Sequence, residues 1–357
     1  MLYFKKSKLI NTRIHKFLHW EHWPLLMFYI PNIPYAFVHG IVARNLVFYT
    51  AVNPGIKNSG IGSESKFKTL QILPKKYIPK SVLHRENQDV EITLKYMKEE
   101  GIDFPLIVKP DVGFRGLLVK KIENKGDLIK YIHKYPISMI IQEFLTHPNE
   151  CGIFYYRHPN EKIGKISSIT LKEFLTIEGD GESTIKELVY SNERAFLYYD
   201  LIKDDPLITW SEIPENGERI KLSSIGNHSK GTRFINGNHL INEQLENSLN
   251  ELNHKVNGWF YGRLDVKYST LEDLYKGNFK ILELNGILAE PTHIYDASKM
   301  NYWKALKTIR THWKQLYKIA RYNHKHNQVS YSKTVPFLRE MFALKAYSNR
   351  LKKLSKR

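Results

Sequence analysis

The chain of 357 residues is 42% apolar and carries a formal net charge of +18. This length allows one large domain or two to three modest ones with an ample core, and the ordinary apolar content indicates a globular protein. The excess of positive charge predicts a phosphate-rich partner, whether a nucleotide, a nucleic acid or an anionic membrane surface. A single cysteine, Cys151, excludes an intramolecular disulfide framework and fits a reducing compartment, so we expect a cytoplasmic protein.

Residues 1–40 form a basic and aromatic N-terminal segment, and its first twenty residues lack the apolar stretch of a signal peptide. The apolar run that ends at Val38 is interrupted by Pro31 and Pro34, so it is too short and too broken to predict a transmembrane helix. Its tryptophans and tyrosines beside basic residues suit peripheral binding to the inner face of a membrane. They suit equally well a helix packed on the domain or a dimer contact, and the oligomeric state stays open.

Residues 41–105 are expected to form an N-terminal α/β region. The apolar run Leu46–Val52 is typical of a buried strand. Further along, Ser65 or Glu64 can cap a helix that carries Lys66. A short strand and an amphipathic helix are expected after it, over 76–82 and 91–100.

Residues 106–300 alternate short apolar strands with amphipathic helices, which predicts a mixed α/β (α+β) domain. Strands are expected at 106–109, 117–121, 139–144, 152–156 and 165–171, and helices at 126–133, 185–190 and 242–256. The Gly-flanked loop 113–116 can wrap a phosphate with its backbone N–H groups and Arg115, although most such loops are only hairpins. Residues 301–357 are expected to form a basic helical tail with a break near 323–335.

The stretch Gly262–Asn285 predicts two antiparallel strands with a polar linker between them. Strand alternation places Arg263, Asp265 and Lys267 on one face of the first strand, and Glu283 and Asn285 on one face of the second. The oxygen atoms of the two carboxylates and the amide suit Mg²⁺, with the guanidinium free to contact a phosphate or a developing oxyanion. Spacing alone allows equally well a solvated hairpin face with its own salt bridge.

Several segments, in this order, resemble motifs of the ATP-grasp superfamily. They are LIVKP at 106–110, QEFLTHPNE at 142–150, GDGESTIKEL at 179–188, GRLD at 262–265 and ELN at 283–285. The resemblance runs from about Lys66 to Asp296 and is to the carboxylate–amine ligases of that superfamily, such as D-alanine–D-alanine ligase and cyanophycin synthetase. It implies an ATP-grasp fold, in which two α/β subdomains of residues 106–300 hold ATP between them.

The resemblance also implies roles for individual residues. Lys66 and Lys109 match the two lysines that neutralise the α- and β-phosphates, and Arg115 stands in the phosphate loop. The other residues expected to bind ATP are Gln142, Glu143 and Leu145, in the segment that reads adenine, and Glu150, which holds the ribose. The register there leaves open whether Gln142 or Glu143 takes each role.

The hairpin residues match the catalytic and metal-binding positions of the same enzymes. Arg263 and Lys172 are expected to be catalytic, and Asp265, Glu283 and Asn285 are expected to bind two Mg²⁺ ions, or Mn²⁺ in their place. Asn227, Ser229 and Gly231 are similar to a polar loop on the substrate side. The resemblance thus implies a ligase that activates a small-molecule or peptide carboxylate as an acyl phosphate, joins it to an amine, and releases ADP and phosphate.

The chain departs from D-alanine ligases in ways that count against D-alanyl-D-alanine synthesis. The phosphate loop is short, the N-terminal segment and basic tail have no counterpart, and GILAEPTHIYD follows Asn285 in place of a turn of small residues. Glu290, His293 and Asp296 in that segment either shape a different acceptor site or cap the helix that follows.

Two other functions stay open from the sequence. One is a membrane- or nucleic-acid-binding protein built on a degenerate ATP-grasp scaffold, and the other is an ATP-grasp phosphotransferase. Nucleic acid is disfavoured because the sequence has no zinc-ligand spacing, no RNP-like aromatic motif and no recognition-helix signature. The carboxylate and amine substrates cannot be named from the residues.

Overall fold

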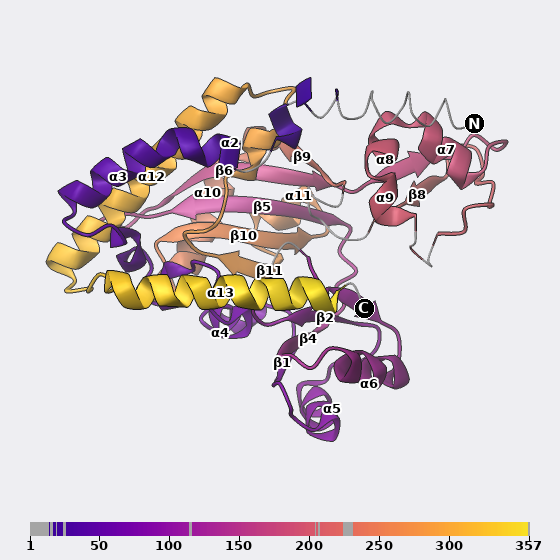
Figure 1. Cartoon of the computed structure of the whole chain (residues 1–357), viewed down its shortest axis with the longest axis horizontal. Coiled ribbons are helices and arrows are strands. Elements are labelled where there is room, and N and C mark those ends of the chain that lie inside the picture. The colour runs from indigo at the N-terminus through magenta and orange to yellow at the C-terminus, as the bar shows by residue number, and fades with distance from the viewer. Residues whose placement is uncertain are drawn as a thin grey trace.

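Two antiparallel sheets and a small third unit make up the protein (Figure 1). The computed structural model describes residues 14, 17–18, 20–23, 26–113, 116–203, 205, 208–223 and 231–355. The mixed α/β architecture predicted from the sequence is confirmed.

The first sheet has the strand order β1-β4-β2-β3. Its strands are β1 (Ser81–His84), β2 (Leu106–Pro110), β3 (Lys120–Ile122) and β4 (Met139–Glu143), and helices α5 (Val90–Glu100) and α6 (Lys125–Lys134) accompany it. Alternation along β2 buries Leu106 and Val108 in a core with these helices, while Ile107 and Lys109 point to the opposite face. Because β1 pairs with β4, this sheet includes residues from before the expected boundary at 106.

The second sheet has the order β11-β10-β5-β6-β9. Its strands are β5 (Asn149–Tyr156), β6 (Lys165–Glu173), β9 (Arg233–Asn236), β10 (Tyr261–Tyr268) and β11 (Lys280–Asn285). Leu264 and Val266 of β10 pack with Leu245 and Leu249 of helix α10 (Glu243–His254) on one face. The antiparallel pairing of β10 with β11 confirms the predicted hairpin, although its linker contains a short helix, α11 (Leu271–Tyr275).

A third unit with its own small core follows β6. It consists of strands β7 (Thr176–Glu178) and β8 (Arg219–Lys221) and helices α7 (Ile185–Ser191), α8 (Glu193–Leu197) and α9 (Tyr199–Ile202). It lies at the right of Figure 1, at one end of the second sheet.

The N-terminal segment and the first of the two C-terminal helices pack beside the second sheet. The N-terminal elements are η1 (Trp20–His22), α2 (Leu26–Tyr29), η2 (Ile30–Asn32) and α3 (Ile33–Val42), and the C-terminal helices are α12 (Tyr302–His326) and α13 (Thr334–Leu354). Phe28 is fully buried against Tyr295 and Tyr302, so this part of the N-terminal segment packs on the domain. Among the helices that the structure describes, none is long and apolar enough to cross a membrane.

The prediction of a buried strand at Leu46–Val52 is wrong. The segment forms a 3-10 helix, η3 (Phe48–Ala51), whose side chains are buried against α12. A short apolar run that is buried on all sides shows no periodicity, so its sequence cannot separate a strand from a helical turn.

Helix α13 connects the body of the molecule to the first sheet. At its start, Phe337 packs edge-on against Tyr49, with 5.9 Å between the ring centroids. At its end, Leu351 and Leu354 enter the core of the first sheet, and the Arg350 guanidinium donates to Glu86 at 2.9 Å. The second half of the predicted basic tail is therefore a helix that packs on the rest of the protein at both of its ends.

The burial of Leu351 gives a direct test of this packing. Leu351 is fully buried, whereas Leu338 on the same helix is 47% exposed. We expect Leu351→Ala to lower the free energy of unfolding by about 2–5 kcal/mol, because it removes buried methyl groups and leaves a cavity. The matched variant Leu338→Ala should change it by less than about 0.5 kcal/mol. Urea unfolding measures both, and equal small effects would show that α13 is not part of the core.

Candidate active site

A large cleft of about 1,610 Å³ lies between the two sheets. Every predicted site residue that the structure describes lines it. These are Lys66, Lys109, Gln142, Glu143, Leu145, Glu150, Lys172, Arg263, Asp265, Glu283 and Asn285. Arg115, Asn227 and Ser229 lie outside the described residues. The folding of the two sheets thus brings together residues that are up to about 220 positions apart in the chain.

The centre of the cleft is the face of the β10–β11 hairpin. The register pairs Arg263 with Asn285 and Asp265 with Glu283, so all four side chains belong to adjacent strands. The Arg263 Nε and Nη2 atoms donate to the two Asp265 carboxylate oxygens at 2.8 and 3.2 Å. Burial opposes ionisation of Asp265, but Arg263 and Lys172 outweigh it and lower the pKa of the carboxyl to about 2. Asp265 is therefore an anion at neutral pH.

Lys66 approaches this hairpin from the start of helix α4 (Lys66–Gln71) and forms an ion pair with Glu283. The position of α4 depends on Asp111, whose carboxylate accepts from the Ser65 hydroxyl at 2.8 Å and the Phe67 N–H at 2.9 Å. Of the two predicted caps, Ser65 is the one that accepts from the helix, at the Lys68 N–H. Asp111 directly follows strand β2, so the strand that carries Lys109 also fixes Lys66.

Lys109 is held by a bulge in the opposite sheet. The pairing of β10 with β11 shifts register after Asp265, and Leu282 is the extra residue there. The Lys109 Nζ donates to the Leu282 carbonyl at 3.0 Å and to Gln142 Oε1 at 3.1 Å. Burial lowers the pKa of this ammonium to about 8, against the attraction of Glu283. Lys109 is thus a desolvated cation that links the two walls of the cleft.

Lys172 belongs to strand β6 of the second sheet, and its ammonium lies between two carboxylates. Its Nζ is 2.6 Å from Glu150 Oε1 and 3.5 Å from Asp265 Oδ2, and its side chain is only 6% exposed. Burial favours the neutral amine, but Asp265 and Glu150 outweigh it and raise the pKa of Lys172 to about 12. Lys172 therefore stays charged and stabilises both anions.

The segment expected to bind adenine begins at the end of strand β4. Gln142 is buried beside Lys109 and donates to the Ser81 hydroxyl at 3.0 Å, while the Glu143 carboxylate accepts from the Lys80 N–H at 2.9 Å. The Leu145 carbonyl accepts from the Lys267 ammonium at 3.1 Å. Both Gln142 and Glu143 line the cleft, so their individual roles stay predictions.

The donor set of the hairpin fits a magnesium ion. Asp265 and Glu283 offer carboxylate oxygens and Asn285 an amide oxygen, which are the hard ligands that Mg²⁺ prefers. The Asn285 Nδ2 atom is buried without a hydrogen-bond partner among the described residues, which fits an amide that interacts with a bound group. Within the described ranges, no three His, Cys, Asp or Glu side chains are grouped to hold a metal ion. Any ion here would thus need ligands from a nucleotide or water.

Two residues that support the site were missed from the sequence, and a third was placed on the correct face without a role. Asp111 positions α4, and Gly152 lies beneath the ion pair, because a Cβ there would be 3.0 Å from Arg263 Cδ and 3.2 Å from Asp265 Oδ1. Lys267, which alternation places with Arg263 and Asp265, reaches the Leu145 carbonyl. No local signal links residue 111 or 152 to the hairpin.

The far end of the cleft is aromatic. Trp23, Tyr29, Phe234 and Trp313 line it together with Glu290. The main-chain carbonyl of Glu290 accepts from Arg263 Nη1 at 3.1 Å, so this end adjoins the hairpin face. The N-terminal segment therefore contributes directly to the cleft.

Three other residues considered for the substrate side, Gly231, His293 and Asp296, are not among the residues that line the cleft. Asp296 accepts from the Asn236 N–H at 2.8 Å and so ties the segment to β9. His293 is buried, and burial lowers the pKa of its imidazole to about 4. Gly231 is buried, and its carbonyl accepts from Arg194 at 3.1 Å. Of the trio Glu290, His293 and Asp296, Glu290 alone lines the cleft.

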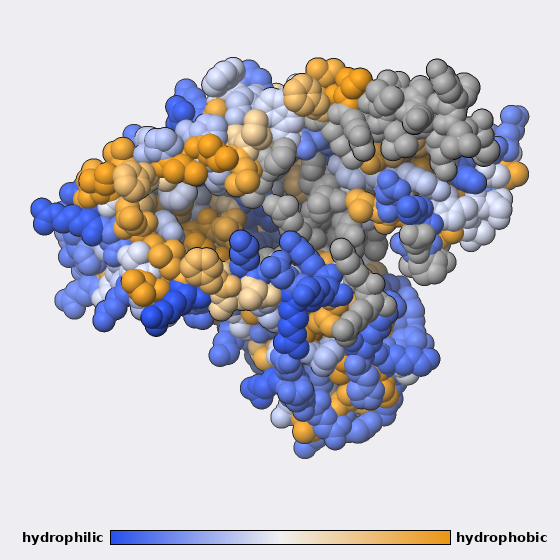
Figure 2. Space-filling model, viewed as in Figure 1, coloured by the Kyte–Doolittle hydropathy of each residue, from blue (hydrophilic) through white to orange (hydrophobic). Residues whose placement is uncertain are grey.

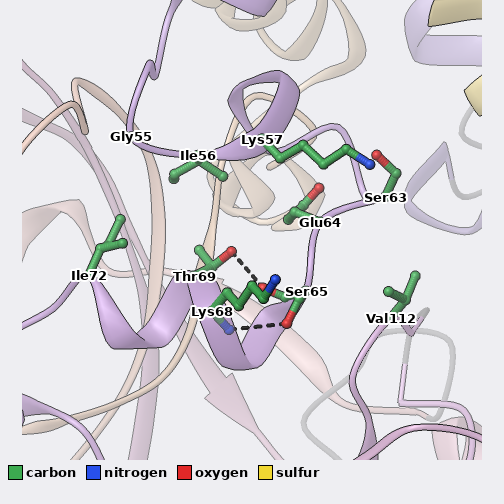
Figure 3. Close-up of a pocket in the computed structure, with 10 residues that line it drawn as sticks. All are labelled: Gly55, Ile56, Lys57, Ser63, Glu64, Ser65, Lys68, Thr69, Ile72 and Val112. Carbon is green, nitrogen blue, oxygen red and sulfur yellow. Dashed lines mark hydrogen bonds between the residues drawn. The ribbon is translucent and has the colours of Figure 1, made fainter. Parts of the chain in front are cut away.

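A second pocket, of about 480 Å³, lies beside helix α4 (Figure 3). Lys57, Glu64 and Lys68 line it, and Glu64 accepts from the Gly62 N–H at 2.6 Å. Burial raises the pKa of the Glu64 carboxyl. The described lining of this pocket includes none of the predicted site residues, so the large cleft is the candidate active site.

Comparison with known protein families gives one match. Residues 63–175 match the family of RimK-like ATP-grasp domains, in line with the ATP-grasp fold that the order of the motifs predicts. The match also supports the prediction of an ATP-dependent ligase that forms C–N bonds. No curated protein matches the sequence.

Solved structures of ligases are similar at low identity. D-alanine–D-alanine ligase from Bacillus anthracis is 14% identical with a TM-score of 0.41, and 71% of this chain and 68% of that chain are covered. The VanG D-Ala:D-Ser ligase from Enterococcus faecalis is 13% identical with a TM-score of 0.42, and 74% of this chain and 64% of that chain are covered. The bifunctional glutathione synthetase from Pasteurella multocida is 15% identical with a TM-score of 0.38, and 70% of this chain and 36% of that chain are covered.

The buried charge network predicts a large stability effect at Lys172. We expect Lys172→Met to lower the free energy of unfolding by about 3–5 kcal/mol, because it leaves Glu150 and Asp265 buried without this cation. Lys165→Met on the same strand is the matched control, since Lys165 is exposed, and it should change stability by less than about 0.5 kcal/mol. Urea unfolding of the two variants measures the difference, and equal values would contradict the network.

Proposed function

We propose that the protein is an ATP- and Mg²⁺-dependent carboxylate–amine ligase that works through an acyl phosphate. The observation that carries this proposal is the convergence of cations from both walls of one cleft on a carboxylate pair. Lys109 reaches the Leu282 carbonyl from strand β2 of the first sheet, and Lys66 reaches Glu283 from helix α4. Arg263 and Lys172 flank Asp265 in the second sheet. Such a set suits a polyphosphate that lies between the sheets and carries a divalent ion.

The buried charges have distinct proposed roles. Asp265, Glu283 and Asn285 would hold Mg²⁺, which when bound neutralises phosphate charge and so lets a carboxylate approach. Lys109 and Lys66 would bind the α- and β-phosphates, and Lys66 would exchange its ion pair with Glu283 for this contact. Each lysine is held near the hairpin, Lys109 by the Leu282 carbonyl and Lys66 by Glu283, so little side-chain ordering is needed on binding.

The proposed reaction has two steps. A substrate carboxylate oxygen attacks the γ-phosphorus of ATP, the bond from that phosphorus to the bridging oxygen breaks, and ADP leaves. An amine nitrogen then attacks the acyl carbon, inorganic phosphate leaves, and the nitrogen loses a proton to solvent. Arg263 would stabilise the oxyanion of the second step, because its guanidinium is fixed by Asp265 and by the Glu290 carbonyl.

The aromatic end of the cleft is the proposed acceptor side. It adjoins Arg263 and carries the Glu290 carboxylate, which accepts from the Tyr295 hydroxyl at 3.2 Å. A carboxylate among aromatic rings suits a substrate with an amino group and an apolar or ring-shaped body. Small-molecule and peptide amines both satisfy this description.

The first test is the thermal stability of the protein with and without Mg·ATP. A ligand that binds only the folded state raises its stability by about 2.7 kcal/mol at a hundredfold excess over Kd. We expect this rise in the wild type to require magnesium and to disappear in Asp265→Asn/Glu283→Gln. The matched control is Asp273→Asn/Glu272→Gln in the exposed linker helix between the same strands, which should keep the full rise.

No rise in folded wild-type protein would overturn the proposal and favour a degenerate scaffold. Where ATP binds, the products separate the remaining functions. A ligase releases ADP only when a carboxylate is present and yields an amide once an amine is added. A stable phosphorylated product with no amide would instead identify a phosphotransferase.

The lowered pKa of Lys109 predicts that ATP affinity depends on pH. The phosphate contact needs the charged ammonium, which is present below pH 8 and lost as the pH rises through the pKa of about 8. If only the protonated form binds, Kd should rise about tenfold between pH 7 and pH 9. Lys109→Arg keeps its charge in this range and should remove most of the dependence. Calorimetric titration at several pH values measures both, and an equal dependence in the variant would exclude Lys109 as its source.

A further inference from the structure

The N-terminal helices expose an unusually apolar surface. Residues 26–43 contain no Asp, Glu, Lys or Arg. The side chains of Ile30, Ile33, Phe37, Val38, Ile41 and Val42 are each 52–58% exposed, and we name these six residues the α3 apolar face. Figure 2 shows the apolar side chains gathered over α3, at the left of the molecule. Monomeric proteins rarely keep so continuous an apolar face in water.

The opposite side of the same segment is firmly packed, so the exposure is a fixed feature of the fold. Phe28 and Asn32 are buried, and Asn32 Oδ1 accepts from the Arg310 Nε of α12 at 2.9 Å. The His39 ring stacks on Tyr317 of α12, with 4.6 Å between the centroids. These contacts orient α3 with its polar positions inward and its apolar face outward.

A row of cations lies beside this face. Helix α12 runs next to α3 (Figure 1), and its sequence has seven Lys and Arg residues with no Asp or Glu. Lys304, Lys307, Lys314, Lys318 and Arg321 are exposed, and their spacing of three, four or seven residues places them in one stripe along the helix. We name these five residues the α12 basic stripe. Trp303, 75% exposed, precedes it at the start of the helix.

We propose that the α3 apolar face and the α12 basic stripe together bind the surface of an anionic lipid bilayer. The apolar side chains would enter the boundary between headgroups and acyl chains, while the lysines and arginine contact the lipid phosphates and Trp303 lies at the interface. The chain's net charge of +18 favours an anionic surface and opposes a contact between two copies of the chain. This inference does not depend on the proposed ligase activity.

Sedimentation with lipid vesicles tests the proposal on the full-length protein. We expect binding to vesicles of phosphatidylcholine mixed with phosphatidylglycerol, weaker binding as salt is raised, and little binding to phosphatidylcholine alone. Phe37→Asp/Ile41→Asp should weaken binding at least about tenfold, because two large apolar side chains no longer enter the bilayer. Lys307→Glu/Lys314→Glu should weaken it as well and reduce its salt dependence.

Helix α5 provides matched controls on another part of the surface. Ile92→Asp/Tyr96→Asp replaces two side chains with the same spacing, which are 44% and 42% exposed, and Lys95→Glu/Lys98→Glu makes the same charge change as the stripe variant. Both should bind vesicles like the wild type. Unchanged circular dichroism and melting temperature would show that each variant folds.

Three results would overturn the proposal. The wild type could fail to sediment with anionic vesicles, or Phe37→Asp/Ile41→Asp could bind them as well as the wild type does. Alternatively, the protein could form a dimer that the same variant dissociates, with no lipid binding at all. That last result would make the α3 apolar face a contact between copies of the chain.

Discussion

The organisation of the cleft follows from placing two carboxylates side by side, one buried and one partly buried. Asp265 and Glu283 face each other across antiparallel strands, and cations close by stabilise their charged forms. Arg263 and Lys172 do this for Asp265, and Lys66 does so for Glu283. Helix α4, which carries Lys66, packs its Leu70 in the core with β10 and β11, and Ser65 before it is bonded to Asp111 after β2. The ion pair of Lys66 thus adds to contacts that already hold α4 beside the hairpin.

The same network is suited to exchange one set of partners for another. A cation paired with a carboxylate can turn to a phosphate at little cost when a metal ion takes its place on the carboxylate. Lys109 differs, because its hydrogen-bond partners in the described part of the chain are a carbonyl and an amide oxygen, which carry no negative charge, and burial lowers its pKa. A bound phosphate would thus supply the negatively charged partner that the Lys109 ammonium lacks among its hydrogen-bond partners.

Sequence reasoning was most successful where a strand has one buried and one polar face. Alternation places Arg263 and Asp265 correctly, and Ser65 is identified as a helix cap by its chemistry. It failed at Leu46–Val52, where burial on all sides hides the period of the structure. It also could not find Asp111, whose contact with Ser65 joins segments that only the tertiary fold brings together. The packing of Phe28 on Tyr295, likewise, has no local signal.

Helix α13 has a consequence for how the cleft can move. A helix of 21 residues is a rod of about 32 Å, and this one is fastened to both walls of the cleft. The Glu340 carboxylate pairs with Lys57 at 2.6 Å near one end, and Leu351 is embedded in the first sheet's core near the other. The helix thus joins the two parts of the molecule by side-chain contacts at both of its ends. Wide separation of the sheets would require one of these attachments to break.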